Sequence, residues 1–179
     1  TISKDGSPKG LLAESWTISD DGLTYTFNIR QGVKFHNGRE LTAEDVKKNF
    51  ERIQREVKGG WLTSAMEQVE SFSAPDEKTF VVKLRAPFAP LLNLLAEAWI
   101  LAPESPGWEA NITQPIGTGP FTFDSWTPQL AINGQKFDEY WMEGKPYVDA
   151  IEFDVREIAD ASLALRAGDY HAAAVPLSK

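Results

Sequence analysis

The sequence contains no cysteine. This absence excludes disulfide bonds, thiolate catalysis and metal sites with cysteine ligands, but it does not fix the compartment in which the protein works. Histidine is nearly as scarce. His36 and His171 are far apart in the chain, and neither has a ligand partner at the spacing typical of metal sites. We therefore expect no metal and no cofactor. His36 follows the pattern of a solvated turn residue, and His171 is expected in a short strand.

Basic residues are also fewer than acidic ones. The chain has 18 Lys and Arg against 26 Asp and Glu, a formal net charge of −8. Its basic residues are scattered, whereas binding to nucleic acid requires a basic face. The sequence therefore predicts no nucleic-acid partner, and the acidity is that of a soluble surface.

A hydrophobic run of membrane-spanning length is missing as well. The longest apolar stretch, LLNLLAEAWILA at 91–102, is short for a span and contains Asn93 and Glu97. The chain begins at Thr1 without a recognisable signal peptide, so we interpret it as a mature chain or a piece of a longer one. There is also no G-x-S-x-G motif, so nucleophilic catalysis has no support.

The apolar residues that are present alternate with polar ones in several stretches. This period of two predicts β-hairpins at 15–30, 69–84 and 121–135, a strand at 151–155 and a last strand at 170–175.

Helical spacing is found between these strands. Thr42 and Asp45 resemble a capping box before a helix at about 43–57. A second helix is expected from Pro90 to Trp99, and a third at 161–167 with Gly168 at its end. The mixture predicts an α+β fold with mixed or antiparallel sheets and a few packed helices.

The stretch PIGTGPF at 115–121 invites comparison with a phosphate-binding loop. It lacks the Lys-Ser/Thr pair, and a strand-like segment rather than a helix follows it, so a phosphate site is excluded. We expect a structural joint instead. Gly117 and Gly119 would supply positive φ or close backbone approach, and Pro120 would open the next strand.

Six tryptophans remain to be explained. Trp16, Trp126 and Trp141 lie in strand or corner contexts, where packing in the core is expected. Trp61 follows a Gly-Gly break and Trp99 ends the second expected helix. These two are better placed to line a cleft.

Several blocks in sequence order resemble the family 5 extracellular solute-binding proteins of peptide and nickel ABC importers. The blocks are GLLAESWTISDDGLTYTFNIRQGVKFHNG, LTAEDVKKNF, PFAPLLNLLA, PIGTGPF, EYWMEGKPYVDAIEFDV and ALRAGDYHAA. The resemblance implies part of a two-lobed fold like that of the type II periplasmic binding proteins. It also implies that the chain is an internal fragment. Residues 1–114 would form the extra subdomain of the first lobe, and residues 115–179 a partial α/β segment of that lobe.

The resemblance also implies a function and a site. The protein would be the solute-binding component of an ABC importer, not an enzyme, that captures a peptide, a metal chelate or another small solute between two lobes. Trp61 and Leu62 match a Trp-Leu pair of the nickel-binding members, while Ala96 stands where those members carry an arginine. Ligand binding is therefore expected at Trp61, Leu62, Ala96 and Trp99.

Partners and location follow from the same resemblance. We expect permease subunits as partners, a monomer, and a periplasmic or extracellular location, with a lipid anchor as one option. Two alternatives stay open from the residues alone. One is a hydrolase with a pair of carboxylates, and the other is a stand-alone module that binds carbohydrate or protein through exposed tryptophans.

Overall fold

The computed structural model describes residues 1–56, 62–155 and 161–173. The larger part of the structure, which precedes β5, contains a four-stranded antiparallel sheet with the strand order β1-β2-β4-β3. The strands are β1 (Ala13–Ile18), β2 (Thr24–Ile29), β3 (Val69–Ser73) and β4 (Thr79–Leu84). Both hairpins expected in this part of the chain are therefore confirmed, and the central pairing joins β2 to β4.

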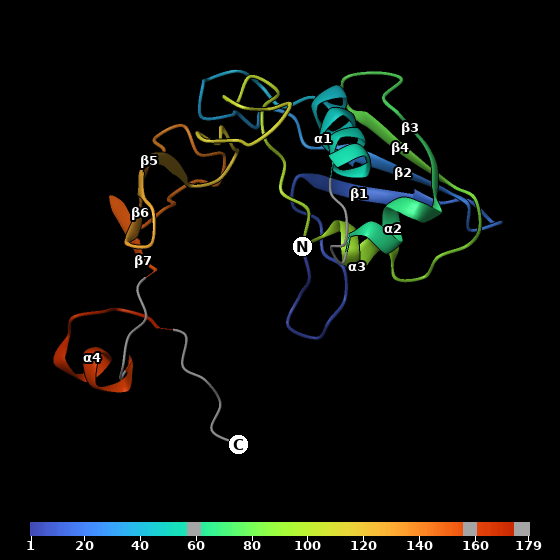
Figure 1. Cartoon of the computed structure of the whole chain (residues 1–179). Coiled ribbons are helices and arrows are strands. Elements are labelled where there is room, and N and C mark those ends of the chain that lie inside the picture. The colour runs from blue at the N-terminus through green and yellow to red at the C-terminus, as the bar shows by residue number, and fades with distance from the viewer. Residues whose placement is uncertain (57–61, 156–160, 174–179) are drawn as a thin grey trace.

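Helix α1 (Ala43–Glu56) lies against one face of this sheet (Figure 1). The contact follows from the alternation of apolar residues along the strands and from their helical spacing along α1. Phe27 and Phe80 are cross-strand partners on the covered face, and Phe50 of α1 stacks on Phe80 with ring centroids 5.5 Å apart. Two short helices, α2 (Thr63–Gln68) and α3 (Leu91–Leu95), complete this part.

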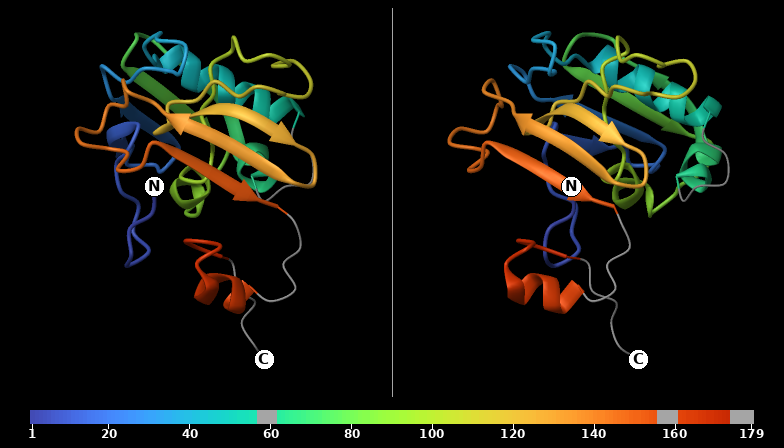
Figure 2. Two further views of the ribbon diagram at one scale, coloured as in Figure 1. Left: turned by 90° about the vertical axis from the view of Figure 1, so that its left-hand side faces the viewer. Right: turned by 60° about the vertical axis from the view of Figure 1, so that its left-hand side comes forward.

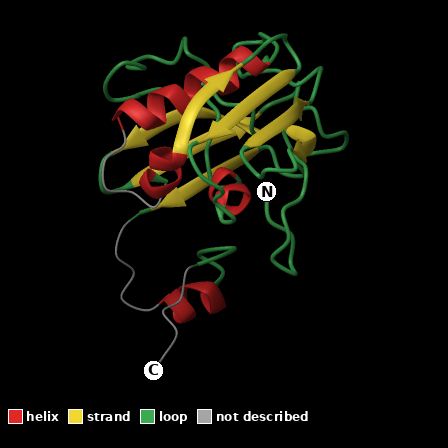
Figure 3. Cartoon of the chain, turned by 90° about the vertical axis from the view of Figure 1, so that its right-hand side faces the viewer, coloured by secondary structure: helices red, strands yellow, loops and turns green. Residues whose placement is uncertain are grey.

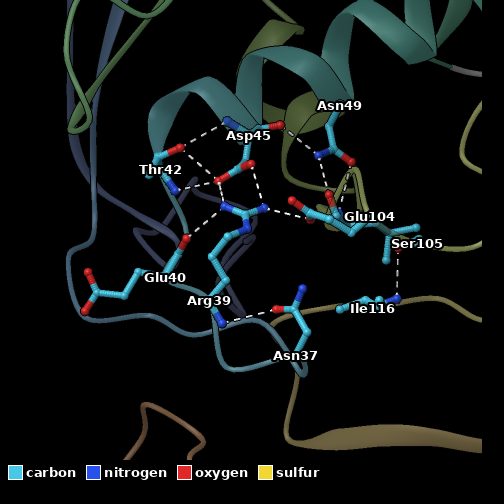
Figure 4. A network of polar contacts seen from close by, with 10 residues as sticks. Asn37, Arg39, Glu40, Thr42, Asp45, Asn49, Glu104, Ser105 and Ile116 are labelled. Carbon is cyan, nitrogen blue, oxygen red and sulfur yellow. Dashed lines mark hydrogen bonds and ion pairs between the residues drawn. The ribbon is translucent and has the colours of Figure 1, made fainter.

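The start of α1 is fixed by a network of polar side chains (Figure 4). The amide N–H of Thr42 donates to Asp45 Oδ2 at 2.9 Å, and the amide N–H of Asp45 donates to Thr42 Oγ1 at 3.4 Å, which confirms the capping box. The guanidinium of Arg39 binds both carboxylate oxygens of Asp45 and also reaches Glu104. Asn49 exchanges hydrogen bonds with the backbone of Leu101. The network thereby ties the segment after α3 to the helix.

The second sheet contains β5 (Phe121–Thr127), β6 (Ala131–Lys136) and β7 (Ala150–Asp154), paired antiparallel in that order (Figure 2). The expected hairpin at 121–135 and the strand at 151–155 are confirmed. Helix α4 (Ala161–Ala167) lies apart from both sheets, and Gly168 with a φ of 84° follows it as expected (Figure 3). The α+β fold class is confirmed.

Three expectations about the elements were wrong. The second helix ends at Leu95 instead of reaching Trp99, because the chain turns at 96–97 and has no regular secondary structure from there to a β-bridge between Leu101 and Gly117. Residues 170–173, the described part of the expected last strand, are not in a strand, so His171 is not a strand residue. Trp126 is 56% exposed rather than in the core.

Candidate functional site

A hollow of about 450 Å³ lies between the second sheet and the segment that follows α3. Residues from the N-terminal segment, the β2–α1 connection, the end of α3 and the PIGTGPF stretch meet there. The lining consists of Leu11, Leu12, His36, Ala96, Ala98, Trp99, Ile100, Leu101, Pro115, Gly117, Thr118, Gly119, Phe121, Thr122, Phe123, Ile132, Asn133, Gly134, Ile151 and Phe153.

One wall of the hollow is the apolar face of the second sheet. Ile132 of β6 is the cross-strand partner of Phe153 in β7, and Gly134 is the partner of Ile151. These four residues point to one face because successive side chains in a strand alternate. Phe153 is 60% exposed, so no described part of the chain covers this face fully.

The hollow unites four of the residues singled out from the sequence. Ala96, Trp99, Gly117 and Gly119 all line it, and Trp99 is 85% exposed. Leu62 is not among the lining residues and packs against the core of the first sheet. Pro120 precedes β5 and does not line the hollow. Trp61 lies outside the described residues.

The reason first given for the two glycines was wrong. Neither Gly117 nor Gly119 has a positive φ. A Cβ atom at Gly117 would meet His36 Cε1 at 3.5 Å, an ordinary contact, and one at Gly119 would meet nothing within 4 Å. Their role as a joint stays a prediction, and it depends on backbone hydrogen bonds rather than on the lack of a side chain.

His36 makes those hydrogen bonds, and it is the residue that sequence reasoning missed. Its Nδ1 accepts a hydrogen bond from the Gly117 amide at 3.2 Å, and its Nε2 lies 3.0 Å from the Gly119 carbonyl oxygen. The His36 amide also donates to the Gly117 carbonyl at 2.9 Å, and its ring packs edge-on against Phe137. The adjacent Asn-Gly turn suggested a solvated position, but the imidazole is half-buried. Only its place inside one of the family-like blocks hinted otherwise.

This geometry requires a neutral imidazole, since Nδ1 must accept while Nε2 donates. Burial lowers the pKa of His36 below its ordinary value of 6.5, and the hydrogen bond with Gly119 opposes this shift only partly. The unfolded imidazole takes up a proton near pH 6.5, whereas the folded one does so only at a lower pH. Stability from His36 is thus complete above the unfolded pKa and is lost as the pH falls from there through the folded pKa.

We expect the free energy of unfolding to drop by about 0.5–1.5 kcal/mol through this group on acidification, the scale of one lost hydrogen bond. Urea titrations at pH 8 and pH 5 would measure the drop. His36→Gln should reduce it, because an amide bonds to the backbone without titrating in this range. His171→Gln, at an exposed position, is the control and should keep it. An unchanged pH dependence in His36→Gln would contradict the assignment.

Two further contacts link the same connection to the chain after β6. Lys34 forms an ion pair with Glu139. The guanidinium carbon of Arg30 lies 4.9 Å from the centre of the Trp141 ring, within the range of a cation–π contact. Arg30, Lys34 and His36 all lie in the connection between β2 and α1. This one segment therefore contacts both the PIGTGPF stretch and the chain after β6.

The described residues contain no group of three or more His, Asp or Glu side chains that could hold a metal ion. Among the described helices, none is long and apolar enough to cross a membrane.

Comparison with known proteins accounts for nearly the whole chain. Residues 7–179 match the sequence profile of the bacterial extracellular solute-binding proteins, family 5 middle region. The glutathione-binding protein GsiB of Escherichia coli K12 is 34% identical over 164 residues, which cover 89% of this chain and 31% of GsiB.

Solved structures agree with this match. NikZ from Campylobacter jejuni in complex with Ni(L-His) has a TM-score of 0.82 at 25% identity, covering 94% of this chain and 35% of NikZ. The oligopeptide-binding protein AppA from Bacillus subtilis in complex with a nonapeptide has a TM-score of 0.78 at 33% identity, with the same coverages of 94% and 35%. DppA from Helicobacter pylori in complex with the peptide STSA has a TM-score of 0.72 at 34% identity, covering 90% and 36%.

The chain thus spans about a third of the length of these relatives. The match to the family extends from residue 7 to the end of the chain. This chain belongs to the bacterial extracellular solute-binding proteins of family 5.

Proposed function

We propose that the chain is part of the solute receptor of an ABC importer, and that the hollow between its second sheet and the segment after α3 contributes to the wall that contacts the solute. The observation that carries the proposal is the convergence of Ala96 and Trp99 with the PIGTGPF stretch on one hollow. Pockets that bind small molecules are concave, mostly apolar and of several hundred Å³, and this hollow has that character.

The proposed division of the chain follows the two sheets. Residues 1–114 would form the extra subdomain and residues 115–179 part of the first lobe, joined through His36 and the PIGTGPF stretch. A second lobe would then close on the solute by a hinge motion, as in other two-lobed binding proteins. The partners would be the permease subunits and the location periplasmic or extracellular, with a monomeric receptor that carries out no covalent chemistry.

The candidate solutes come from the relatives. GsiB is a glutathione-binding protein, AppA and DppA were solved with peptides, and NikZ with a nickel–histidine complex. The hydrolase alternative gains no support from Asp45 or Glu139, because each carboxylate is held in an ion pair. Asp45 pairs with Arg39, and Glu139 pairs with Lys34.

Calorimetry on the protein at its natural length would test the proposal against tripeptides, glutathione and nickel–histidine. We expect saturable binding of at least one solute, and compaction on binding in X-ray scattering. Trp99→Ala should weaken that binding by about tenfold, as for an aromatic side chain in a binding site. Tyr147→Ala is the control, because Tyr147 is also an exposed aromatic residue but does not line the hollow. No binding of any solute, or equal effects of the two substitutions, would contradict the proposal.

A further inference from the structure

Two asparagines in the chain are followed directly by glycine, at Asn37-Gly38 and Asn133-Gly134. Asparagine is a thermolabile residue, because the backbone nitrogen that follows it can attack its side-chain amide. Glycine at the next position favours the attack, since it has no side chain to obstruct its nitrogen and its backbone bends freely. The fold places the two pairs in opposite surroundings, so we expect their reactivities to differ.

The pair Asn37-Gly38 lies in an exposed turn between β2 and α1. Gly38 has a φ of 85°, and its amide N–H donates to the Phe35 carbonyl oxygen at 2.8 Å. The Arg39 amide N–H donates to Asn37 Oδ1 at 3.2 Å. This bond folds the side-chain amide back over the turn and polarises the carbonyl group that a nitrogen nucleophile attacks. One hydrogen bond of an exposed turn therefore has to open before the Gly38 nitrogen can react.

The pair Asn133-Gly134 lies inside β6, the central strand of the second sheet. Asn133 is paired with Ser125 of β5 and with Glu152 of β7. Its side-chain amide donates to Ser125 Oγ at 3.1 Å. To form a ring with the Gly134 nitrogen, Asn133 would have to leave the extended conformation of the strand, with loss of ladder hydrogen bonds. The sheet therefore protects this asparagine.

We propose that Asn37 is a site of spontaneous deamidation in this protein. The Gly38 nitrogen forms a bond to Cγ of Asn37 and gives up its proton, and the side-chain nitrogen leaves as ammonia. Water then opens the succinimide ring at either of its carbonyl carbons, which produces aspartate or isoaspartate and adds one negative charge. Water is the only co-reactant, and nothing is oxidised or reduced. The inference does not depend on the function proposed above.

The product disturbs contacts on both sides of the turn. In isoaspartate the main chain runs through the former side chain and is one carbon longer, so the bond from the Arg39 amide to Asn37 Oδ1 is lost. The new carboxylate also competes with Asp45 for the guanidinium of Arg39. On the other side of the turn, His36 binds the backbone of the PIGTGPF stretch. Deamidation therefore loosens the connection between β2 and α1.

Peptide mapping by mass spectrometry tests the site. The protein at its natural length would be incubated at pH 8, both folded and in urea, and conversion of each asparagine followed over time. In the folded protein we expect Asn37 to convert at least about tenfold faster than Asn133, a factor that a barrier difference of about 1.4 kcal/mol produces. In urea the two should convert at similar rates, because the strand no longer protects Asn133. No conversion at Asn37, similar rates in the folded protein, or a difference that persists in urea would overturn the proposal.

The melting temperature tests the consequence. Aged wild-type protein should melt about 2 °C below fresh protein, the scale of one lost hydrogen bond. Asn37→Ser cannot deamidate, and its hydroxyl can still accept from the Arg39 amide, so it should keep its melting temperature on ageing. Asn133→Ser is the matched control and should lose as much as the wild type. If Asn37→Ser loses as much as the wild type, or the converted wild type loses nothing, the loosening of the connection is overturned.

Discussion

Replacing Phe80 with alanine is expected to lower the free energy of unfolding by about 3–5 kcal/mol, the range found for deletion of a buried aromatic ring. Phe80 of β4 is only 2% exposed. Its ring is stacked with those of Phe27, Phe50 and Phe72, at centroid distances of 5.9, 5.5 and 5.9 Å. One residue therefore joins β2, β3 and α1, and its removal leaves a cavity that three elements border.

Urea denaturation followed by circular dichroism would measure the loss. The matched control is Phe153→Ala, the same change on the exposed face of the second sheet, where we expect a loss below about 1 kcal/mol. Equal losses at the two positions would contradict the burial seen in the structure. A loss confined to Phe153→Ala would mean that the second sheet carries the principal core.

The elements of the first part could be predicted because their signals are local. The alternation from Leu23 to Ile29 and the helical stripe of Val46, Phe50 and Ile53 each specify an element and its buried face within a few residues. The sheet order could not be predicted this way. The pairing of β2 with β4 joins segments about fifty residues apart, and no local pattern encodes such a pairing.

Part of the lining of the hollow was named from the sequence. Ala96 was named because the family resemblance aligns it with an arginine of the nickel-binding members, and the glycines of PIGTGPF were named because they mark a break between elements. His36 was not, because it contacts Gly117 and Gly119 across 81 and 83 residues. An Asn-Gly turn next to a histidine predicts that the imidazole is exposed to solvent, but tertiary packing half-buries the ring of His36.

Replacing Arg39 with methionine is expected to cost about 2–3 kcal/mol of unfolding free energy. Removal of one partner from a buried ion pair costs about 3–5 kcal/mol. Solvent reduces this figure here, because the Arg39 side chain is 36% exposed although that of Asp45 is only 6% exposed. Two parallel hydrogen bonds of 2.8 and 2.9 Å would be lost, and the Asp45 carboxylate would keep only its bonds to Thr42.

Arg55→Met is a close control for this change. Arg55 also contacts two carboxylates, those of Glu56 and Glu109, but all three side chains are exposed. Exposed ion pairs contribute little, so thermal or urea denaturation should detect almost no change. Equal losses for the two arginines would mean that burial of the carboxylate does not set the strength of the network.

The pH dependence of the same variants tests the mechanism. Burial raises the pKa of Asp45, but hydrogen bonds from Arg39 and Thr42 outweigh it and hold the pKa below its ordinary value of 3.8. A carboxylate with a lowered folded pKa stabilises the fold fully above its unfolded pKa, and this contribution is lost as the pH falls through the folded pKa. In Arg39→Met, the hydrogen bonds and charge of Arg39 no longer lower the pKa of Asp45. The variant should therefore lose less stability than the wild type between pH 5 and pH 2, and the two titrations should converge at the acid end, where protonated Asp45 no longer binds Arg39 as an ion pair.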